Sequence, residues 1–228
     1  MRETVHIPVL PCEIMQLGCP RQGQLWVDGT GGGGGHSRLI LEAIGPSGHL
    51  LILDRDPAAA MQLQEMFAEA AMVRHGSYDD LPSILEELAM PLVNGIVLDL
   101  GLSSDQLADR DRGFSFQSEG ELDMRYDTSD GLPVWQWLAR VDERTLADTI
   151  FQFGEERFSR RIARRIVESR RERPIRSAVQ LRDLIYRSVP GGRPTPAGRR
   201  HGRVDPATRT FQALRIAVNQ ELEILQNA

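Results

Sequence analysis

The sequence predicts an α/β protein built on a parallel sheet. Over the first hundred positions, short apolar runs alternate with helix-like stretches of about ten to fifteen residues, which is typical of parallel strands joined by right-handed crossovers. A second observation is the stretch LWVDGTGGGGGHS at residues 25–37, where an apolar run ends in an aspartate and breaks into glycines. Glycines between a strand and a helix let the backbone approach a ligand closely.

The elements of this sheet follow in order. Strands are expected at 25–28, 49–54, 72–75 and 95–100, because each is a short apolar run bounded by turn residues. Helices are expected at 37–44, 57–71 and 81–88, between these strands. Asp28, Asp54 and Asp99 then fall at three strand ends. Ligands of parallel sheets bind beyond the carboxyl ends of the strands, so these carboxylates mark the expected site.

The alternation stops after residue 101. Residues 105–206 begin with loop signals (DRDRGFSFQSEGELD) and continue with helical periods at 135–146 and 158–170. A further amphipathic helix is expected at 206–226, with one face formed by Leu214, Val218, Leu222 and Leu225. We therefore expect residues 1–104 and 207–228 to form an incomplete sheet domain. Residues 105–206 are expected to form a helical insertion that recognises the substrate.

Composition narrows the class of protein. The chain has 228 residues, of which 41% are hydrophobic, enough for one sizeable core or one domain with an insertion. Its apolar runs are far shorter than the roughly 20 residues of a membrane span, and a secretory signal is not recognisable, so a cytoplasmic protein without membrane contact is expected. Cys12 and Cys19 lack zinc-ligand spacing, so no metal is expected.

Positive charge is concentrated in one part of the chain. Residues 157–215 contain 17 arginines against four acids, although the whole chain has a net charge of -5. A solvated helix face is the simplest explanation of such a run. Here the excess of arginine over acidic residues continues through the loop-like PGGRPTPAGRRHGR. Guanidinium groups form bidentate hydrogen bonds with phosphate. The charge pattern therefore favours contact with a nucleic acid.

The glycine run is compatible with two cofactors. Gly29, Gly31 and Gly34 satisfy the dinucleotide pattern G-x-G-x-x-G, and Asp54 follows 20 residues later, so a nicotinamide cofactor remains an alternative. Asp28 at the first strand end would repel a pyrophosphate, whereas S-adenosylmethionine carries an ammonium and a sulfonium cation and no phosphate. The acidic strand end favours S-adenosylmethionine. Asp54 would accept hydrogen bonds from both ribose hydroxyls of this cofactor.

Successive motifs resemble one known family. DGTGGGGGHSRLIL, LDRDP, HGSYDDL, GIVLDLGLSSDQL, RGFSF, ELDMRYD, FGEERFSRRIARRIV and PATRTFQALRIAVNQELE occur in order over almost the whole chain. They resemble the ribosomal RNA small subunit methyltransferase H family, which methylates the N4 amine of cytosine 1402 of 16S rRNA. The resemblance implies a class I S-adenosylmethionine methyltransferase fold, Rossmann-like, with an inserted helical domain. Relative to that family, the last strands of the sheet are missing after Ala228.

The resemblance also implies a set of site residues. Gly34, Gly35 and His36 match the cofactor-binding loop, Asp54 the ribose-binding acid, and Tyr78 an aromatic position beside the adenine. Asp99 and Gln106 match further cofactor positions. His36 is expected to orient the loop or the cofactor by a hydrogen bond rather than to act as a general base.

Catalysis is expected to require an acceptor for the N4-H bond of cytosine. Asp99 with the following loop, including Ser103 and Ser104, is the candidate region. An unstacked target base needs aromatic support, for which Phe114 and Phe116 are candidates, or these rings anchor the insertion. The arginines expected to contact rRNA are Arg157, Arg160, Arg161, Arg164, Arg209 and Arg215.

Three functions follow from the sequence. The first is an S-adenosylmethionine-dependent rRNA cytosine-N4 methyltransferase that acts on 16S rRNA or the small ribosomal subunit. The second is a non-catalytic remnant that binds RNA or cofactor, suggested by the missing strands. A nicotinamide-dependent oxidoreductase is the third. The oligomeric state is left open, with a homodimer among the options.

Overall fold

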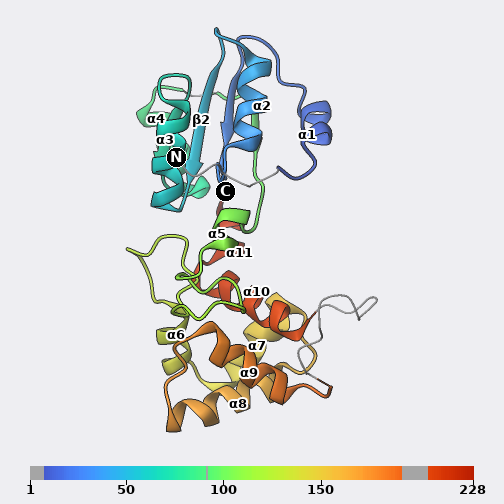
Figure 1. The fold of residues 1–228 in the computed structure, drawn as a ribbon. Coiled ribbons are helices and arrows are strands. Elements are labelled where there is room, and N and C mark those ends of the chain that lie inside the picture. Colours follow the sequence, from blue (N-terminus) through green and yellow to red (C-terminus); the bar gives the residue numbers. More distant parts are fainter. Residues whose placement is uncertain (1–7, 91, 192–204) are drawn as a thin grey trace. The chain divides into compact units, whose positions relative to one another are not determined.

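The first part of the chain forms a parallel four-stranded sheet flanked by helices (Figure 1). The computed structural model describes residues 8–90, 92–191 and 205–228. Its strands β1 (Leu25–Asp28), β2 (His49–Asp54), β3 (Met72–His75) and β4 (Gly95–Val97) lie in the order β3-β2-β1-β4. All three pairs of neighbouring strands are parallel, which confirms the α/β fold with a parallel sheet.

Helices cover the two faces of this sheet. One face, which includes Trp26, Ile52 and Val97, packs against α1 (Pro11–Gly18), α2 (Gly35–Ile44) and α3 (Pro57–Phe67). The other face, which includes Val27 and Leu51, packs against α4 (Leu81–Glu87). A 3-10 turn, η1 (Tyr78–Asp80), leads from β3 into α4. The parallel order places the carboxyl ends of the strands at one edge of the sheet.

The second part of the chain is helical. It contains α6 (Val134–Arg140), α7 (Glu143–Gly154), α8 (Ser159–Glu172), α9 (Ala178–Ser188) and α10 (Pro206–Val218). Helix α7 packs against both α8 and α10. Gly154 makes the second contact close, because a Cβ atom there would lie 2.4 Å from the carbonyl oxygen of Arg209. A single bridge, between Glu121 and Ser177, is the extended pairing outside the sheet in the described residues.

The chain divides into two compact units. One contains residues 1–105 and 223–228, and the other contains residues 106–222. The first boundary falls within the short helix α5 (Ser104–Ala108), and the second within α11 (Glu221–Asn227). Whether the helical unit is the substrate-recognition domain stays a prediction.

Several element boundaries differ from the sequence prediction. Strand β4 ends at Val97 rather than at residue 100, and α3 ends at Phe67 because Ala68 has a positive φ of 43°. The helical period at 135–146 belongs to two helices, since Asp142 caps a new helix by accepting from the N-H of Thr145. Local capping thus overrides a continuous apolar period.

The predicted helix at 206–226 is also two helices. Its break lies at Asn219, whose side-chain amide donates to the carbonyl oxygen of Met124 and accepts from the N-H of Tyr126, and at Gln220, with φ of 52°. Leu214 is buried, whereas Leu222 is 43% and Leu225 38% exposed, so the predicted apolar face is wrong. Helices α1 and α9 were not predicted, although Ser177 and Gln180 form a capping box before α9.

Candidate active site

Two strand-end carboxylates meet the glycine loop at the carboxyl edge of the sheet. Asp28 is the last residue of β1 and Asp54 the last residue of β2. Asp99 follows β4 by two residues, and its backbone N-H donates to the Thr30 hydroxyl at 2.7 Å. The loop between β1 and α2 therefore touches the ends of three neighbouring strands, as expected for a ligand site in a parallel sheet.

Asp54 is held by backbone groups. Its Oδ2 accepts from the N-H of Gly32 at 2.7 Å, and its Oδ1 accepts from the N-H of Asp56 at 2.8 Å. Gly32 has φ of 49°, a conformation that glycine adopts without strain. Burial raises the pKa of Asp54 to about 6, against the opposing effect of these two hydrogen bonds. The carboxylate is therefore ionised at neutral pH and keeps lone pairs for two further donors.

Asp28 is committed to the loop itself. It is only 1% exposed, accepts from the Ser37 hydroxyl at 2.6 Å through Oδ2, and accepts from the N-H of Thr30 at 3.2 Å through Oδ1. Burial raises the pKa of this carboxyl group above its ordinary value. The geometry favours support of the loop over the direct cofactor contact that was predicted. Ser37 and Thr30, the hydroxyls that flank the glycine run, are the partners that sequence reasoning missed.

His36 lies between the amino-terminal segment and Asp99. Its ring is 6% exposed, and its Nε2 donates to the carbonyl oxygen of Val9 at 3.0 Å. Its Nδ1 lies 3.8 Å from Oδ2 of Asp99. The carboxylate of Asp99 therefore faces the His36 ring and offers acceptor oxygens beside the glycine loop.

The other predicted cofactor residues lie as follows. Gly34 has φ of 75° at the start of α2, and a Cβ atom on Gly35 would meet the ring of Pro8 at 2.9 Å. Tyr78 is 7% exposed and packs against Gly29 of the loop. Their contacts with a cofactor stay predictions.

The predicted catalytic serines follow Asp99 in the chain. Ser103 lies beside the loop, because its Cβ would be 3.8 Å from a Cβ atom on Gly32. Ser104 begins α5 and is exposed. Gln106 belongs to the helical unit, so its place at the cofactor site stays untested.

The helical unit divides the predicted RNA-binding arginines into two groups. Arg160 and Arg161 are exposed on α8, and their side chains form no ion pair or hydrogen bond with other residues that the structure describes. Arg157 is exposed with its guanidinium 4.5 Å above the ring of Phe158. Arg164 is 68% exposed, and its Nε lies 3.4 Å from Oε1 of Glu143. These four side chains remain accessible to an anionic partner.

The other two arginines are engaged inside the unit. Arg215 is 15% exposed and donates through Nε and Nη2 to Glu221, at 2.7 and 3.0 Å. Its charge is thereby neutralised, so the predicted RNA contact is not supported. Arg209 donates to the carbonyl oxygen of Glu155 at 3.1 Å. Arg171, Arg173 and Arg187, which the sequence analysis did not single out, are exposed on or beside α8 and α9.

The two candidate aromatic side chains pack within the helical unit. Phe114 is 4% exposed, and its ring stacks on that of Tyr126 with centroids 5.9 Å apart. The ring of Phe116 meets Phe211 edge to face at 5.8 Å. These contacts favour the anchoring interpretation over a base-stacking role, with the anchor inside the helical unit.

The described ranges 8–90, 92–191 and 205–228 contain no group of three or more histidine, cysteine, aspartate or glutamate side chains arranged to hold a metal ion. In the same ranges, every helix is too short or too polar to cross a membrane.

Comparison with known proteins gives the family. Residues 3–228 match the MraW methylase family. The ribosomal RNA small subunit methyltransferase H of Trichlorobacter lovleyi is 47% identical over 227 residues, covering 98% of this chain and 70% of that protein. The proteins of the same name from Syntrophotalea carbinolica and Thermomicrobium roseum are each 46% identical, over 97% of this chain and 69% and 67% of their own lengths. The chain therefore belongs to the MraW methylase family of methyltransferases.

Proposed function

We propose that this chain transfers a methyl group from S-adenosylmethionine to the N4 amine of a cytosine in 16S rRNA, at position 1402. The relatives' printed name supports rRNA of the small subunit as the substrate. The observation that carries the proposal is the Asp54 carboxylate, buried and held by the N-H groups of Gly32 and Asp56. It offers two acceptor oxygens beside bare loop backbone, which fits the two hydroxyls of an adenosine ribose.

The site residues supply binding and orientation. When bound, S-adenosylmethionine provides an electrophilic methyl group on a sulfonium cation. Asp54 holds the ribose hydroxyls, and the glycine loop lets its backbone lie against the cofactor. Tyr78, which is buried beside Gly29, packs next to the adenine ring of the cofactor. The absence of a phosphate on this cofactor agrees with an acidic strand end at Asp28.

The reacting amine needs to be oriented, because its lone pair is delocalised into the cytosine ring. The Asp99 carboxylate, whose Oδ2 lies 3.8 Å from Nδ1 of His36, is an acceptor, so an N4-H bond directed at it would localise the nitrogen lone pair toward the methyl group. Bound S-adenosylmethionine would supply the methyl group to N4 and would keep the electron pair of the broken C-S bond on sulfur. The extra proton of the methylated amine then passes to water.

In this proposal the RNA backbone is bound by exposed arginines on α8 and just before it. Arg157, Arg160, Arg161 and Arg164 present their guanidinium groups to solvent. Such contacts position a substrate without reading its sequence.

A non-catalytic remnant that binds RNA or cofactor is the alternative. It is motivated by the length of this chain, which spans about 70% of its relatives. The test is transfer of labelled methyl from S-adenosylmethionine to small ribosomal subunits lacking the modification, with the label mapped by nuclease digestion and mass spectrometry. Label on N4 of cytosine 1402, lost in Asp99→Ala, is expected. No transfer, while a full-length relative is active in parallel, would establish the remnant instead.

A further inference from the structure

Asp99 lies just beyond the hydrogen-bonded ladder between β1 and β4. Strand β4 ends at Val97, whose carbonyl oxygen accepts from the N-H of Gly29 at 2.9 Å. Two residues later, the N-H of Asp99 donates to the side-chain hydroxyl of Thr30 at 2.7 Å. A side-chain acceptor therefore holds the backbone of Asp99 at a point where the strand itself has ended.

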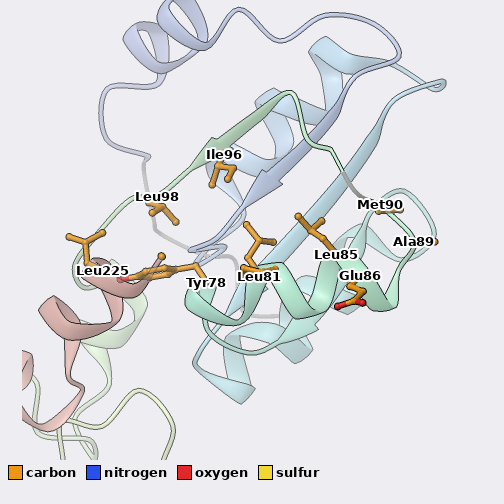
Figure 2. Close-up of a pocket in the computed structure, with 11 residues that line it drawn as sticks. Tyr78, Leu81, Leu85, Glu86, Ala89, Met90, Ile96, Leu98 and Leu225 are labelled. Carbon is orange, nitrogen blue, oxygen red and sulfur yellow. The ribbon is translucent and has the colours of Figure 1, made fainter.

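The direction of the Asp99 side chain follows from the alternation of side chains along this segment. Ile96 and Leu98 line the pocket on the α4 side of the sheet (Figure 2). Val97 belongs instead to the apolar cluster that packs with α2 on the opposite face. Because successive side chains of an extended segment point to opposite faces, Asp99 points to the α2 face. There its Oδ2 lies 3.8 Å from Nδ1 of His36, a residue of α2.

Asp28 fixes both of the elements that contact Asp99. Its Oδ1 accepts from the backbone N-H of Thr30 at 3.2 Å, and its Oδ2 accepts from the hydroxyl of Ser37 at 2.6 Å. Ser37 follows His36 in the first turn of α2. One carboxylate that is only 1% exposed therefore connects the acceptor of the Asp99 backbone with the helix that faces the Asp99 side chain.

We propose that Thr30 is a positioning residue, which places the Asp99 carboxylate for the amine of the substrate base through its hydrogen bond to the Asp99 N-H. Asp28 supports Thr30 in this role. The inference rests on the proposed function, in which Asp99 accepts the N4-H bond. A displacement of about 1 Å can cost on the order of 100-fold in rate. Because Thr30 acts through Asp99, its loss is expected to lower turnover and to leave cofactor affinity nearly unchanged.

Three variants of the 228-residue chain test this role. Thr30→Val keeps the shape of the side chain and removes the hydroxyl, whereas Thr30→Ser keeps the hydroxyl. Thr208→Val is the matched control, because Thr208 is exposed on α10. In methyl transfer to small ribosomal subunits, Thr30→Val is expected to lower kcat roughly 10- to 100-fold with little change in the KM for S-adenosylmethionine. Thr30→Ser is expected to restore most of kcat, and the control to leave it unchanged.

Two measurements by nuclear magnetic resonance do not require turnover. The amide of Asp99 is expected to exchange with solvent roughly fivefold faster in Thr30→Val, because its acceptor is lost. The ring resonances of His36 are expected to shift, because the carboxylate beside them moves. Thr30→Ser should keep both close to those of the unaltered chain. If the unaltered chain transfers no methyl group, the proposed function fails, and these two measurements alone decide the role of Thr30.

Three outcomes would overturn the inference. The first is a Thr30→Val variant with unchanged kcat, unchanged amide exchange at Asp99 or unshifted His36 resonances. The second is a loss of kcat that Thr30→Ser does not restore, because the hydroxyl would then not be the group that matters. The third is a raised KM for S-adenosylmethionine at constant kcat, which would place Thr30 in the cofactor site itself. If circular dichroism shows that Thr30→Val is unfolded, Thr30→Ala replaces it in every comparison, since it also removes the hydroxyl.

Discussion

The sheet unit and the helical unit use buried charge in opposite ways. In the sheet unit the candidate ligand-binding carboxylate, Asp54, is buried at a strand end and held by backbone N-H groups. In the helical unit the buried cation, Arg215, is paired with Glu221, and the arginines available to a partner are the exposed ones. The buried carboxylate of Asp54 keeps acceptor capacity for a ligand, whereas the donors of the buried Arg215 already bond to Glu221.

The difference has a physical cause. A small, partly cationic ligand is bound by a few acceptors that the backbone fixes in place before binding. A polyanion is attracted by charges spread over an exposed surface, where counterion release supplies the free energy. A buried arginine whose donors are already used contributes little to such attraction.

Removal of the buried carboxylate is expected to have the largest effect. Asp54→Ala should weaken S-adenosylmethionine binding by about 1.5 to 3 kcal/mol, or roughly 10- to 150-fold, because hydrogen bonds to a charged group are lost. Calorimetric titration measures the dissociation constant. Glu65→Ala, an exposed acid on α3, removes the same charge and serves as the control. An unchanged constant for Asp54→Ala would remove this residue from the ribose site.

The pH dependence of stability tests how strongly burial acts on Asp54. Its pKa of about 6 in the folded state exceeds the ordinary value of 3.8, so the folded state binds the proton more tightly. The resulting stability is present below pH 4 and is lost as the pH rises through 6. Relative to Asp54→Asn, the unliganded protein should lose on the order of 2 kcal/mol of unfolding free energy between pH 4 and pH 7.5.

Urea unfolding of both proteins at several pH values provides that measurement. The comparison with Asp54→Asn cancels most of the titration of other groups, including Asp28. A difference that stays constant across this pH range would show that the folded state does not raise the pKa of Asp54.

Exposed arginines are expected to contribute the smallest individual effects. Removing one phosphate contact should reduce the magnitude of the slope of log K against log salt concentration by about 0.7 for single-stranded RNA. This corresponds to a roughly fivefold loss of affinity at 0.1 M salt. Arg160→Ala and Arg161→Ala are the variants, measured by RNA binding at several salt concentrations. Arg144→Ala, 92% exposed on α7, removes the same charge elsewhere in the helical unit. Equal slopes for all three variants would show general attraction without an α8 surface.

The sheet unit could be predicted from sequence more closely than the helical unit. Strands β1, β2 and β3 begin and end at the predicted residues, because turn residues adjacent to short apolar runs stop them. In the helical unit, the breaks at Asp142 and Asn219 interrupt periods that looked continuous. The Asn219 break depends on Met124 and Tyr126, which lie more than 90 positions away in the chain, so local pattern could not reveal it.

The sequence by itself determined the parallel α/β class, the glycine loop between β1 and α2, and the motifs of the family, since each is encoded in neighbouring residues. Only the tertiary structure decided that Asp28 supports the loop, that Arg215 is neutralised, and that Ile96 of β4 is half-exposed. These properties depend on which side chains become hydrogen-bond partners, and spacing along the chain does not fix that choice even for residues nine or fewer positions apart. Folding decides that through burial and hydrogen bonding across the chain.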